Sequence, residues 1–377
     1  MPLEVIDLDA QATSPLLPQA LAAMLPWLER QHWNPHSAHR GGRMAKAVVE
    51  VARMQVAKLA GVTPEALIFT SGATESNNMA LKGMLEGEGR RLLTFPTEHS
   101  CVRQTALHLQ KLGHQIEFLP VLADGMPDMT AYATALAAGD VALVSAMWVN
   151  NEIGSIWPIA EMARMAHAHG ALLHSDAAQA FGKVDVTGAD VDLLSLTAHK
   201  IGGPKGIGAL YVRPGIRLAP LLDGGGQEAE IRSGTLSPAL AAGFGAAAAA
   251  ADLPATRTHA EQLMRIARDL LAAVPHRVNG PEPLGEQRWP GNLSVTFPGV
   301  DSSRIMSALP GLALSTGSAC SSGTGKTSHV LAAIGVPDQA IRQTLRLGWN
   351  SALSAAILHD ALQQLVATVQ RLQPARA

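Results

Sequence analysis

Short apolar segments alternate with amphipathic segments through the middle of this chain of 377 residues. Apolar residues at helical spacing over 44–60 predict a helix that ends at Gly61, and "TPEALIFT" (63–70) leads into a short strand. Alternation of this kind is typical of an α/β fold, in which helices cover the faces of a mostly parallel sheet. The further strands that we expect are residues 91–95, 141–147, 171–176 and 191–197.

Polar residues cluster just after the carboxyl end of each expected strand. In open α/β sheets, ligands bind in the crevice outside these ends. Because all of these strands deliver polar groups to the same edge, the residues alone predict a binding site there. The residues concerned are Ser71, Gly72, Ala73, Thr74, Glu98, His99, Asn150, Asn151, Asp176, His199 and Lys200.

The sequence pattern changes near residue 255. An Ala-rich helical segment precedes this point, and a long amphipathic helix, a strand and a helical C-terminus follow it. Such a mixture predicts a second, smaller α+β domain. We therefore expect a large domain of residues 12–255 and a small domain made of residues 1–11 and 256–377.

Composition and charge argue against several classes of protein. Hydrophobic residues make up 47% of the chain and charged residues 16%, with 29 Lys and Arg against 31 Asp and Glu. This is the composition of a compact globular protein, and its charge balance favours neither nucleic acid nor a membrane as a partner. The N-terminus lacks the pattern of a signal peptide, and a count of two cysteines fits a reducing compartment. We expect a cytoplasmic enzyme.

Two ionisable residues at the sheet edge match the needs of a cofactor that has a pyridinium ring and is bound through a Schiff base. Lys200 comes directly after a strand and before a Gly-rich turn, where a fixed backbone suits an amine that forms a Schiff base. Asp176, with Gln179 one helical turn later, is the charged partner that a pyridinium nitrogen requires. The turn "TSGATES" offers backbone N–H groups to a phosphate. Each residue also has an ordinary structural explanation: a surface lysine, a helix-capping aspartate or serine, and a core position for His99.

One of the two cysteines stands in an unexpected place. Cys320 lies in the polar, Gly-containing segment "STGSACSSGTGKTSHV" (315–330), whereas cysteines are usually buried. The same segment nearly matches the phosphate-binding motif G-x-x-x-x-G-K-[ST], but Cys320 takes the place of its first glycine. A nucleotide-binding protein that uses residues 320–327 is therefore an alternative from a different class. We expect no metal site, because no second Cys or His stands at ligand spacing, and we interpret Cys101 as a small residue at a helix start.

A set of motifs occurs in order and at compatible spacing along most of the chain. Together they resemble the cysteine desulfurases of the NifS/IscS type, pyridoxal-phosphate enzymes of the class V aminotransferase family with the fold type I architecture. The resemblance implies a homodimer that converts L-cysteine to L-alanine and delivers the sulfur to an acceptor or iron–sulfur scaffold protein. The motifs are "TSGATESNN", "TEH", "VNNEIG", "HSDAAQ", "TAHKIGGPKGIGALYV", "GGGQE", "RSGT" and "GSAC".

The resemblance also implies which residues act on the substrate. Cys320 would be the nucleophile that takes sulfur from the substrate cysteine and becomes a persulfide. Lys200 would hold the cofactor covalently, and His99 would stack over its ring and assist proton transfers. Arg346, in "TLRL", would bind the substrate carboxylate, with Asn34 of "NPHSAH" close to the same group.

For the cofactor, the resemblance implies a second set of contacts. Asp176 would face the ring nitrogen, and Asn151 and Gln179 would lie near the ring hydroxyl. Thr235 would reach the phosphate of the second subunit. The remaining residues around the phosphate would be Ala73, Thr74, Thr197, Ala198 and His199. Two alternatives keep this fold: a selenocysteine lyase or cysteine-sulfinate-acting relative, and a partner protein without catalytic activity.

Overall fold

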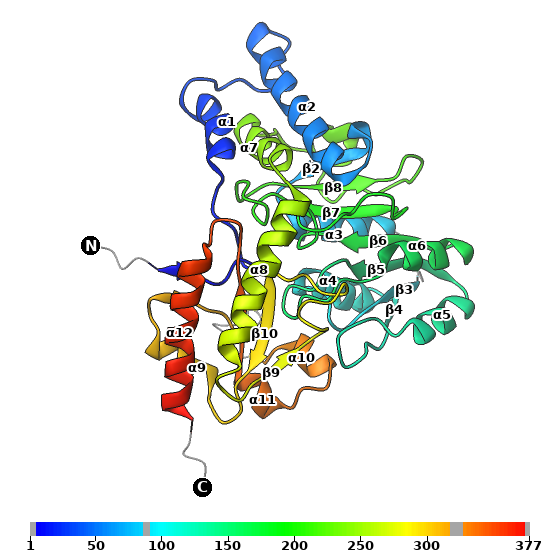
Figure 1. Ribbon diagram of the computed structural model, residues 1–377. Helices are drawn as coiled ribbons and strands as arrows, with labels where there is room; N and C mark the ends of the chain where they lie inside the picture. The colour runs from blue at the N-terminus through cyan, green and yellow to red at the C-terminus, as the bar shows by residue number, and fades with distance from the viewer. Residues whose placement is uncertain (1–4, 86–90, 317–326, 374–377) are drawn as a thin grey trace.

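The computed structural model describes residues 5–85, 91–316 and 327–373. Its central sheet is made of β2 (Leu67–Thr70), β3 (Arg91–Thr94), β4 (Gln115–Phe118), β5 (Val141–Met147), β6 (Leu172–Asp176), β7 (Leu193–Thr197) and β8 (Gly208–Val212). The strand order is β2-β8-β7-β6-β5-β3-β4 (Figure 1). Strand β8 is antiparallel to β2 and β7, and the other pairs are parallel. All strands except β8 therefore point the same way, which confirms the mostly parallel α/β fold.

Strands β4 and β8 are the two strands of this sheet that the sequence did not predict. Strand β4 forms one edge of the sheet and is only partly buried, so it lacks the apolar run that marks an inner strand. Strand β8 follows β7 through a Gly-rich turn rather than a helix, and it returns in the opposite direction. It breaks the strand–helix alternation on which the prediction depended.

Helices cover both faces of the central sheet. Neighbouring residues on a strand face opposite sides, so each strand packs against both layers of helices. Leu92 on β3 packs in a cluster with residues of α3 (Ala73–Met84) and α4 (Ser100–Lys111). Leu93, the next residue, packs on the other face in the main core, which includes residues of α2 (Arg40–Ala60). With both faces buried, a binding site can open only at an edge of the sheet.

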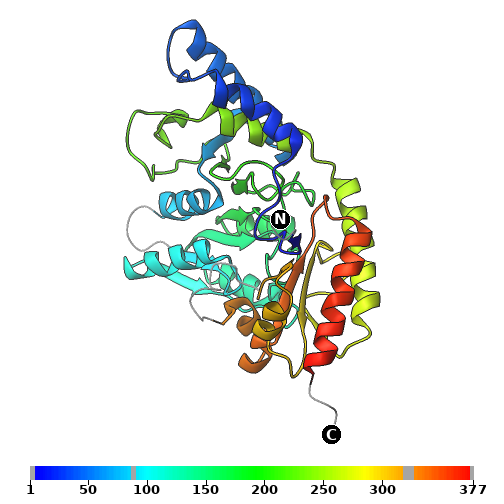
Figure 2. The same cartoon turned by 90° about the vertical axis from the view of Figure 1, so that its left-hand side faces the viewer.

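A smaller sheet follows in the chain. Its strands and the helices beside it are β9 (Arg277–Asn279), β10 (Asn292–Thr296), β12 (Thr344–Gly348), α8 (Leu253–Leu271) and α12 (Ala355–Leu372). The strand order is β12-β10-β9, and α8 and α12 run side by side next to it (Figures 1 and 2). Strand β1 (Ile6–Asp7) pairs with β11 (Leu312–Ala313), so the start of the chain lies against its C-terminal part. The expected domain boundary at residue 255 falls in the first turn of α8 and stays a prediction.

A group of three helices, α1 (Pro18–Glu29), α2 and α7 (Pro238–Ala249), stands at one end of the molecule (Figure 1). The Ala-rich α7 packs closely on α2, since a Cβ added to Gly245 would lie 2.6 Å from the Cα of Ala52. Helix α2 ends as predicted, at Gly61, whose φ of 69° is left-handed. The other helices are α5 (Met129–Ala137), α6 (Ile159–Ala168), α9 (Ser302–Ala308), α10 (His329–Ala333), α11 (Asp338–Arg342) and the 3-10 helices η1 (Pro64–Ala66) and η2 (Glu228–Glu230).

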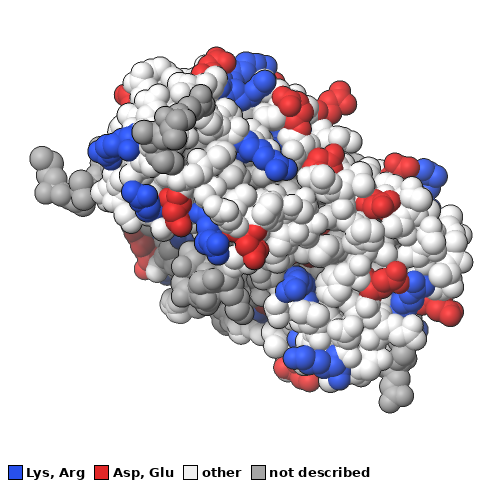
Figure 3. Space-filling model, turned by 90° about the horizontal axis from the view of Figure 1, so that it is seen from below, with Lys and Arg blue, Asp and Glu red and all other residues white. Residues whose placement is uncertain are grey.

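Among the described residues, no single membrane-spanning helix stands out, and no one sign of charge dominates the face shown in Figure 3. Among the described helices, none is by itself long and apolar enough to cross a membrane; only α7 and α8 taken together could, by length and composition, and they are bent by 74°. On the face shown in Figure 3, acidic and basic side chains are interspersed. This distribution agrees with the near balance of 29 Lys and Arg against 31 Asp and Glu in the whole chain.

Candidate active site

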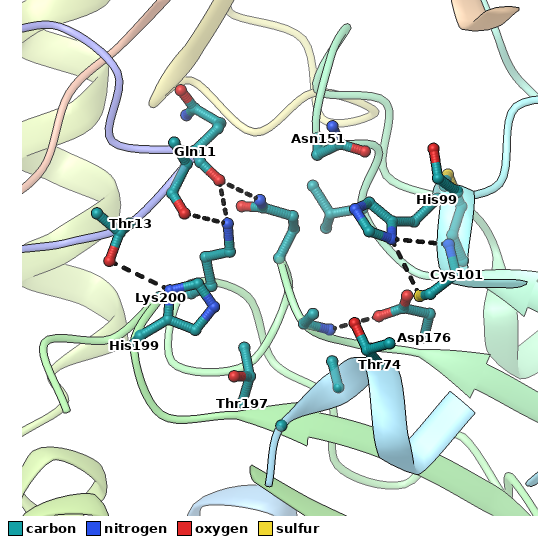
Figure 4. A pocket seen from close by; sticks show the side chains of 18 of the residues that line it. Gln11, Thr13, Thr74, His99, Cys101, Asn151, Asp176, Thr197, His199 and Lys200 are labelled. Carbon is teal, nitrogen blue, oxygen red and sulfur yellow. Dashed lines mark hydrogen bonds between the residues drawn. The ribbon is translucent and has the colours of Figure 1, made fainter. Parts of the chain in front are cut away.

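A cavity of about 510 Å³ opens at the edge of the central sheet where its parallel strands end (Figure 4). Most of the predicted site residues line it, although they come from segments spread over the chain. The structure thus brings them to one place. These residues are Ala73, Thr74, His99, Asn151, Asp176, Gln179, Thr197, His199, Lys200 and Arg346.

Six predicted site residues are not in this lining. Glu98 and Asn150 are buried outside it. Ala198 is completely buried beside it. Asn34 and Thr235 are exposed on loops, and neither belongs to the lining that the described residues form. Cys320 lies outside the described residues. The nucleotide-binding alternative uses residues 320–327, and of these only residue 327 is described.

Lys200 lies in the turn after β7, and its amine meets the N-terminal segment of the chain. Its Nζ donates hydrogen bonds to the carbonyl oxygens of Gln11 and Ala12, the latter at 2.7 Å. The ring of the neighbouring His199 lies 3.2 Å from Oγ1 of Thr13. Burial lowers the pKa of His199 to about 4, and the positive charge of Lys200 adds to this shift, so the ring is neutral at pH 7. The N-terminal segment thus closes one side of the cavity, which its sequence alone does not indicate.

Asp176 ends β6 at the floor of the cavity, with 6% of its surface exposed. Its Oδ2 accepts a hydrogen bond from Nδ2 of Asn77 (2.7 Å), and its Oδ1 accepts one from the backbone N–H of Ala178 (2.9 Å). These two donors fix the orientation of the carboxylate. Asn77 belongs to the "TSGATESNN" motif, but the sequence does not reveal this contact because 99 positions separate the two residues.

His99 directly precedes α4, and its ring caps the start of that helix. Its Nδ1 accepts the backbone N–H of Cys101 at 3.2 Å, so this nitrogen carries no proton and the neutral ring is protonated at Nε2. Burial lowers the pKa of His99, an effect that Asp176 opposes and Lys200 reinforces. His99 is therefore a neutral imidazole at pH 7.

Cys101 is at the start of α4, as expected, but it also lines the cavity. Its Sγ lies 3.0 Å from Nδ1 of His99 and 3.1 Å from Nδ2 of Asn77. Burial raises the pKa of this thiol to about 12, and the negative charge of Asp176 adds to the shift. Cys101 is thus a protonated thiol. Its position two residues after His99 is the one feature of the sequence that could have indicated its place in the site.

The first turn of α3 borders the cavity with donor groups. Gly72 precedes the helix with a φ of 150°, and no side chain among the described residues caps the helix there. A Cβ added to Gly208 would lie 2.6 Å from the Cα of Gly72, so the turn sits tightly against β8. The uncapped N–H groups and the nearby hydroxyls suit a phosphate. The residues of this end of the cavity are Ser71, Gly72, Ala73, Thr74 and Thr197.

Arg346 on β12 reaches the cavity from the smaller sheet. The residue is 1% exposed, and its guanidinium donates hydrogen bonds to Oδ1 of Asp9 (2.5 Å) and to the carbonyl oxygen of Asn151 (3.2 Å). These contacts join the N-terminal segment, the turn after β5 and the smaller sheet. The resemblance implied that Arg346 belongs to the site, and the structure does bring it there.

Two buried acids and a histidine support the same side of the cavity. Glu152 accepts a hydrogen bond from Oγ of Ser328 at 2.5 Å, and Glu98 accepts one from the backbone N–H of Met147 at 2.7 Å. The Nε2 of His329 lies 2.9 Å from the carbonyl oxygen of Glu98. Burial raises the pKa of both carboxyl groups. Glu98 stands behind the lining, whereas Glu152 and His329 line the cavity and were not predicted, because their contacts are distant in sequence.

Comparison with known proteins assigns the chain to a family. A family model described as aminotransferase class-V matches residues 6–349. The chain belongs to the class V aminotransferases. Its sequence is 41% identical to that of the mitosomal cysteine desulfurase of Encephalitozoon cuniculi, over 98% of this chain and 87% of the relative. It is 40% identical to the cysteine desulfurase IscS of Rickettsia bellii, over 98% of this chain and 92% of the relative.

Two solved structures share the fold of this chain. A NifS-like protein superposes with a TM-score of 0.90 at 31% identity, over 98% of this chain and 100% of the other. A structure described as SspA in complex with cysteine superposes with a TM-score of 0.81 at 32% identity, over 92% of this chain and 99% of the other. These comparisons confirm the NifS/IscS resemblance and the fold type I architecture expected from the sequence.

The class V enzyme depends on pyridoxal phosphate, and the cavity fits each part of that cofactor. The uncapped turn of α3 suits the phosphate, the oriented carboxylate of Asp176 suits a protonated ring nitrogen, and Lys200 supplies an amine. All three groups line the same cavity. The donor set therefore agrees with the family assignment.

Proposed function

We propose that this chain is a cysteine desulfurase that releases L-alanine from L-cysteine and keeps the sulfur as a persulfide on Cys320. The observation that carries the proposal is the convergence of Lys200, Asp176 and the uncapped turn of α3 on one cavity. It is supported by relatives named cysteine desulfurase at about 40% identity and by a related structure that holds cysteine.

The floor of the cavity holds the cofactor in this proposal. Bound pyridoxal phosphate supplies an electron sink that allows bonds around the α-carbon of the amino acid to break. Lys200 would hold it covalently, and Asp176, oriented by Asn77, would keep the ring nitrogen protonated. Asn151 and Gln179 would face the ring hydroxyl. The first turn of α3, together with Thr197, Ala198 and His199, would bind the phosphate.

Two side chains handle the substrate. Arg346 exchanges part of its pairing with Asp9 for the substrate carboxylate. A place for Asn34 close to the same group stays a prediction, since Asn34 lies outside the lining that the described residues form. The neutral ring of His99 carries its proton at Nε2, because Nδ1 is occupied by the N–H of Cys101. His99 would stack over the cofactor ring and would pass protons to and from the substrate through Nε2.

Cys320 is the nucleophile of the sulfur transfer. Its thiolate attacks the sulfur of the substrate, an S–S bond forms, and the Cβ–S bond breaks. A proton on the released carbon completes L-alanine, so L-cysteine and one enzyme thiol give L-alanine and one enzyme persulfide. The other cysteine is unsuited to this step, because a thiol with a pKa of about 12 supplies almost no thiolate at pH 7.

A homodimer completes the site. Thr235 is exposed on its own subunit, and we place it against the phosphate of the other subunit. Helices α1 and α2 expose several large apolar residues, which a second copy of the chain covers. These residues are Leu21, Leu25, Leu28, Val51 and Met54. Light scattering of the purified protein tests the dimer, and Leu25→Glu combined with Met54→Glu should shift it towards the monomer.

The acceptor of the sulfur is a second protein, for iron–sulfur cluster assembly or for thiolation. We place the reaction in the cytoplasm, although relatives include mitochondrial and mitosomal proteins.

The activity itself tests the proposed function: purified protein with bound cofactor should form L-alanine from L-cysteine. A chain that forms no alanine from L-cysteine, with or without a reductant, would contradict the proposal. Faster turnover of L-selenocysteine would favour the selenocysteine lyase alternative.

A further inference from the structure

Lys183 lies behind the site and has no part in the proposed reaction. It follows β6 and the turn that carries Gln179, and its Nζ donates a hydrogen bond to Oε1 of Gln179 at 2.9 Å. A second cavity of about 460 Å³ has Lys183, Lys200 and Gln11 in its lining. The amine of Lys183 therefore stands between this cavity and the back of the cofactor site.

The amide of Gln179 has two partners of opposite kind. A protonated lysine can only donate hydrogen bonds, so it holds the oxygen of the amide on its own side. The amide nitrogen of Gln179 donates to the carbonyl oxygen of Gln11 at 2.9 Å, and a carbonyl oxygen can only accept. The same carbonyl also accepts a hydrogen bond from Lys200. Lys183 is thus the first member of a chain of contacts that ends at Lys200.

We propose that Lys183 is a positioning residue, which holds the amide of Gln179 with its NH2 group towards the cofactor site. The inference rests on the proposed function, in which Gln179 faces the ring hydroxyl of pyridoxal phosphate. In this orientation Gln179 offers a donor to that oxygen. With the amide turned over, two oxygen atoms would face each other, and the contact would be repulsive.

The charges around Lys183 make this orientation sensitive to pH. Burial lowers the pKa of Lys183 to about 7, and the positive charges of Lys200 and Arg346 add to the shift. Among the described residues, Asp252 and His259 are the other titratable groups that line the second cavity. A neutral amine has a lone pair and can accept from the NH2 group of Gln179, so above pH 7 Lys183 no longer favours one orientation of the amide, and only the carbonyl oxygen of Gln11 still does.

A double-mutant cycle tests the proposal. Lys183→Met removes the donor at similar length, and Gln179→Ala removes the amide on which it acts. The affinity of the apo-protein for pyridoxal phosphate is measured by equilibrium dialysis, and the absorbance of the bound cofactor is titrated with pH. We expect Lys183→Met to weaken cofactor binding about tenfold and to shift the midpoint of the titration. In the Gln179→Ala background, Lys183→Met should leave the affinity for the cofactor unchanged, and only the smaller shift of the titration that comes from the direct charge interaction of Lys183 with Lys200 should remain.

The outcomes separate this inference from the proposed function. Equal effects of Lys183→Met in both backgrounds, or no effect in the wild-type background, would overturn the positioning role. Failure of the wild-type chain to bind pyridoxal phosphate would overturn the proposed function and this inference with it. Lys111→Met, at an exposed lysine at the end of α4, is the matched control and should leave both quantities unchanged. Should Lys183→Met not fold, Lys183→Gln takes its place in the cycle and should give an effect of the same sign.

Discussion

Groups that follow strands of the central sheet form the floor of the cavity, whereas residues from distant parts of the chain form its wall. On the floor, Asp176 ends β6 and Lys200 lies in the turn after β7. In the wall, Arg346 donates to Asp9, which is 337 positions away. The sheet fixes the floor as part of its own backbone, but the wall exists only when both ends of the chain are in place. We therefore expect floor substitutions to change cofactor binding and wall substitutions to change substrate binding.

Lys200→Ala should have the largest effect. Without the amine, the floor cannot hold the cofactor covalently, so turnover should be lost and the absorbance of the covalent complex should disappear. Circular dichroism should show an intact fold. Lys205→Ala, five residues on in the same Gly-rich turn, should keep that absorbance. Loss of the absorbance in Lys205→Ala but not in Lys200→Ala would mean that the wrong lysine has been assigned.

Arg346→Met tests the wall. Two hydrogen bonds from a charged group are lost, so KM for L-cysteine should rise about 100-fold while the cofactor stays bound. Loss of the cofactor with an unchanged KM in this variant would contradict the expectation that wall residues act on substrate binding. Steady-state kinetics together with the absorbance of the bound cofactor distinguish the two results. Arg342→Met, at an exposed arginine of α11, is the matched control.

Asn77→Ala tests how the floor is supported. It removes the 2.7 Å hydrogen bond to Asp176, so the carboxylate loses its fixed orientation, and the affinity for the cofactor should fall about tenfold. The neighbouring Asn78 donates to the carbonyl oxygen of Thr74 instead, and Asn78→Ala should have a smaller effect. Equal losses in the two variants would show that helix stability, rather than the carboxylate, is responsible.

The last effect concerns the stability of the fold beneath the floor rather than binding. His174 is completely buried between the hydroxyls of Ser145 and Ser195, and burial lowers its pKa from 6.5 to about 3. Between these values the unfolded chain binds more protons than the folded chain, so the free energy of unfolding falls as the pH drops below 6.5. For this one group, the loss should be about 2 kcal/mol at pH 5. Urea unfolding at pH 7 and pH 5 measures it, and His174→Gln should lose less between the two pH values than the wild type does.

The floor could be predicted from the sequence because each of its residues follows a strand end that has its own local pattern. Asp176, Lys200 and the α3 turn all fall where the alternation of strands and helices indicates. The wall could not be predicted in this way, because the contact between Arg346 and Asp9 depends on how the two ends of the chain fold together. Only the family resemblance indicated Arg346.

Three other features of the site could not be predicted from the sequence for the same reason. The place of Cys101 in the cavity, the support of Asp176 by Asn77 and the contact of Gln11 with Lys200 each depend on side-chain contacts that no local pattern reveals. The roles of Asn34 and Thr235 stay predictions, since neither residue belongs to the lining that the described part of the chain forms.

The two cysteines provide the most direct test of the proposed reaction. After incubation with L-cysteine, mass spectrometry of the digested protein should find one additional sulfur atom on the peptide that contains Cys320, and a reductant should remove it. Cys320→Ser should bind the cofactor but form neither persulfide nor alanine, whereas Cys101→Ser should stay close to the wild type. An additional sulfur on Cys101, or full turnover in Cys320→Ser, would contradict the assignment of Cys320 as the sulfur-accepting nucleophile.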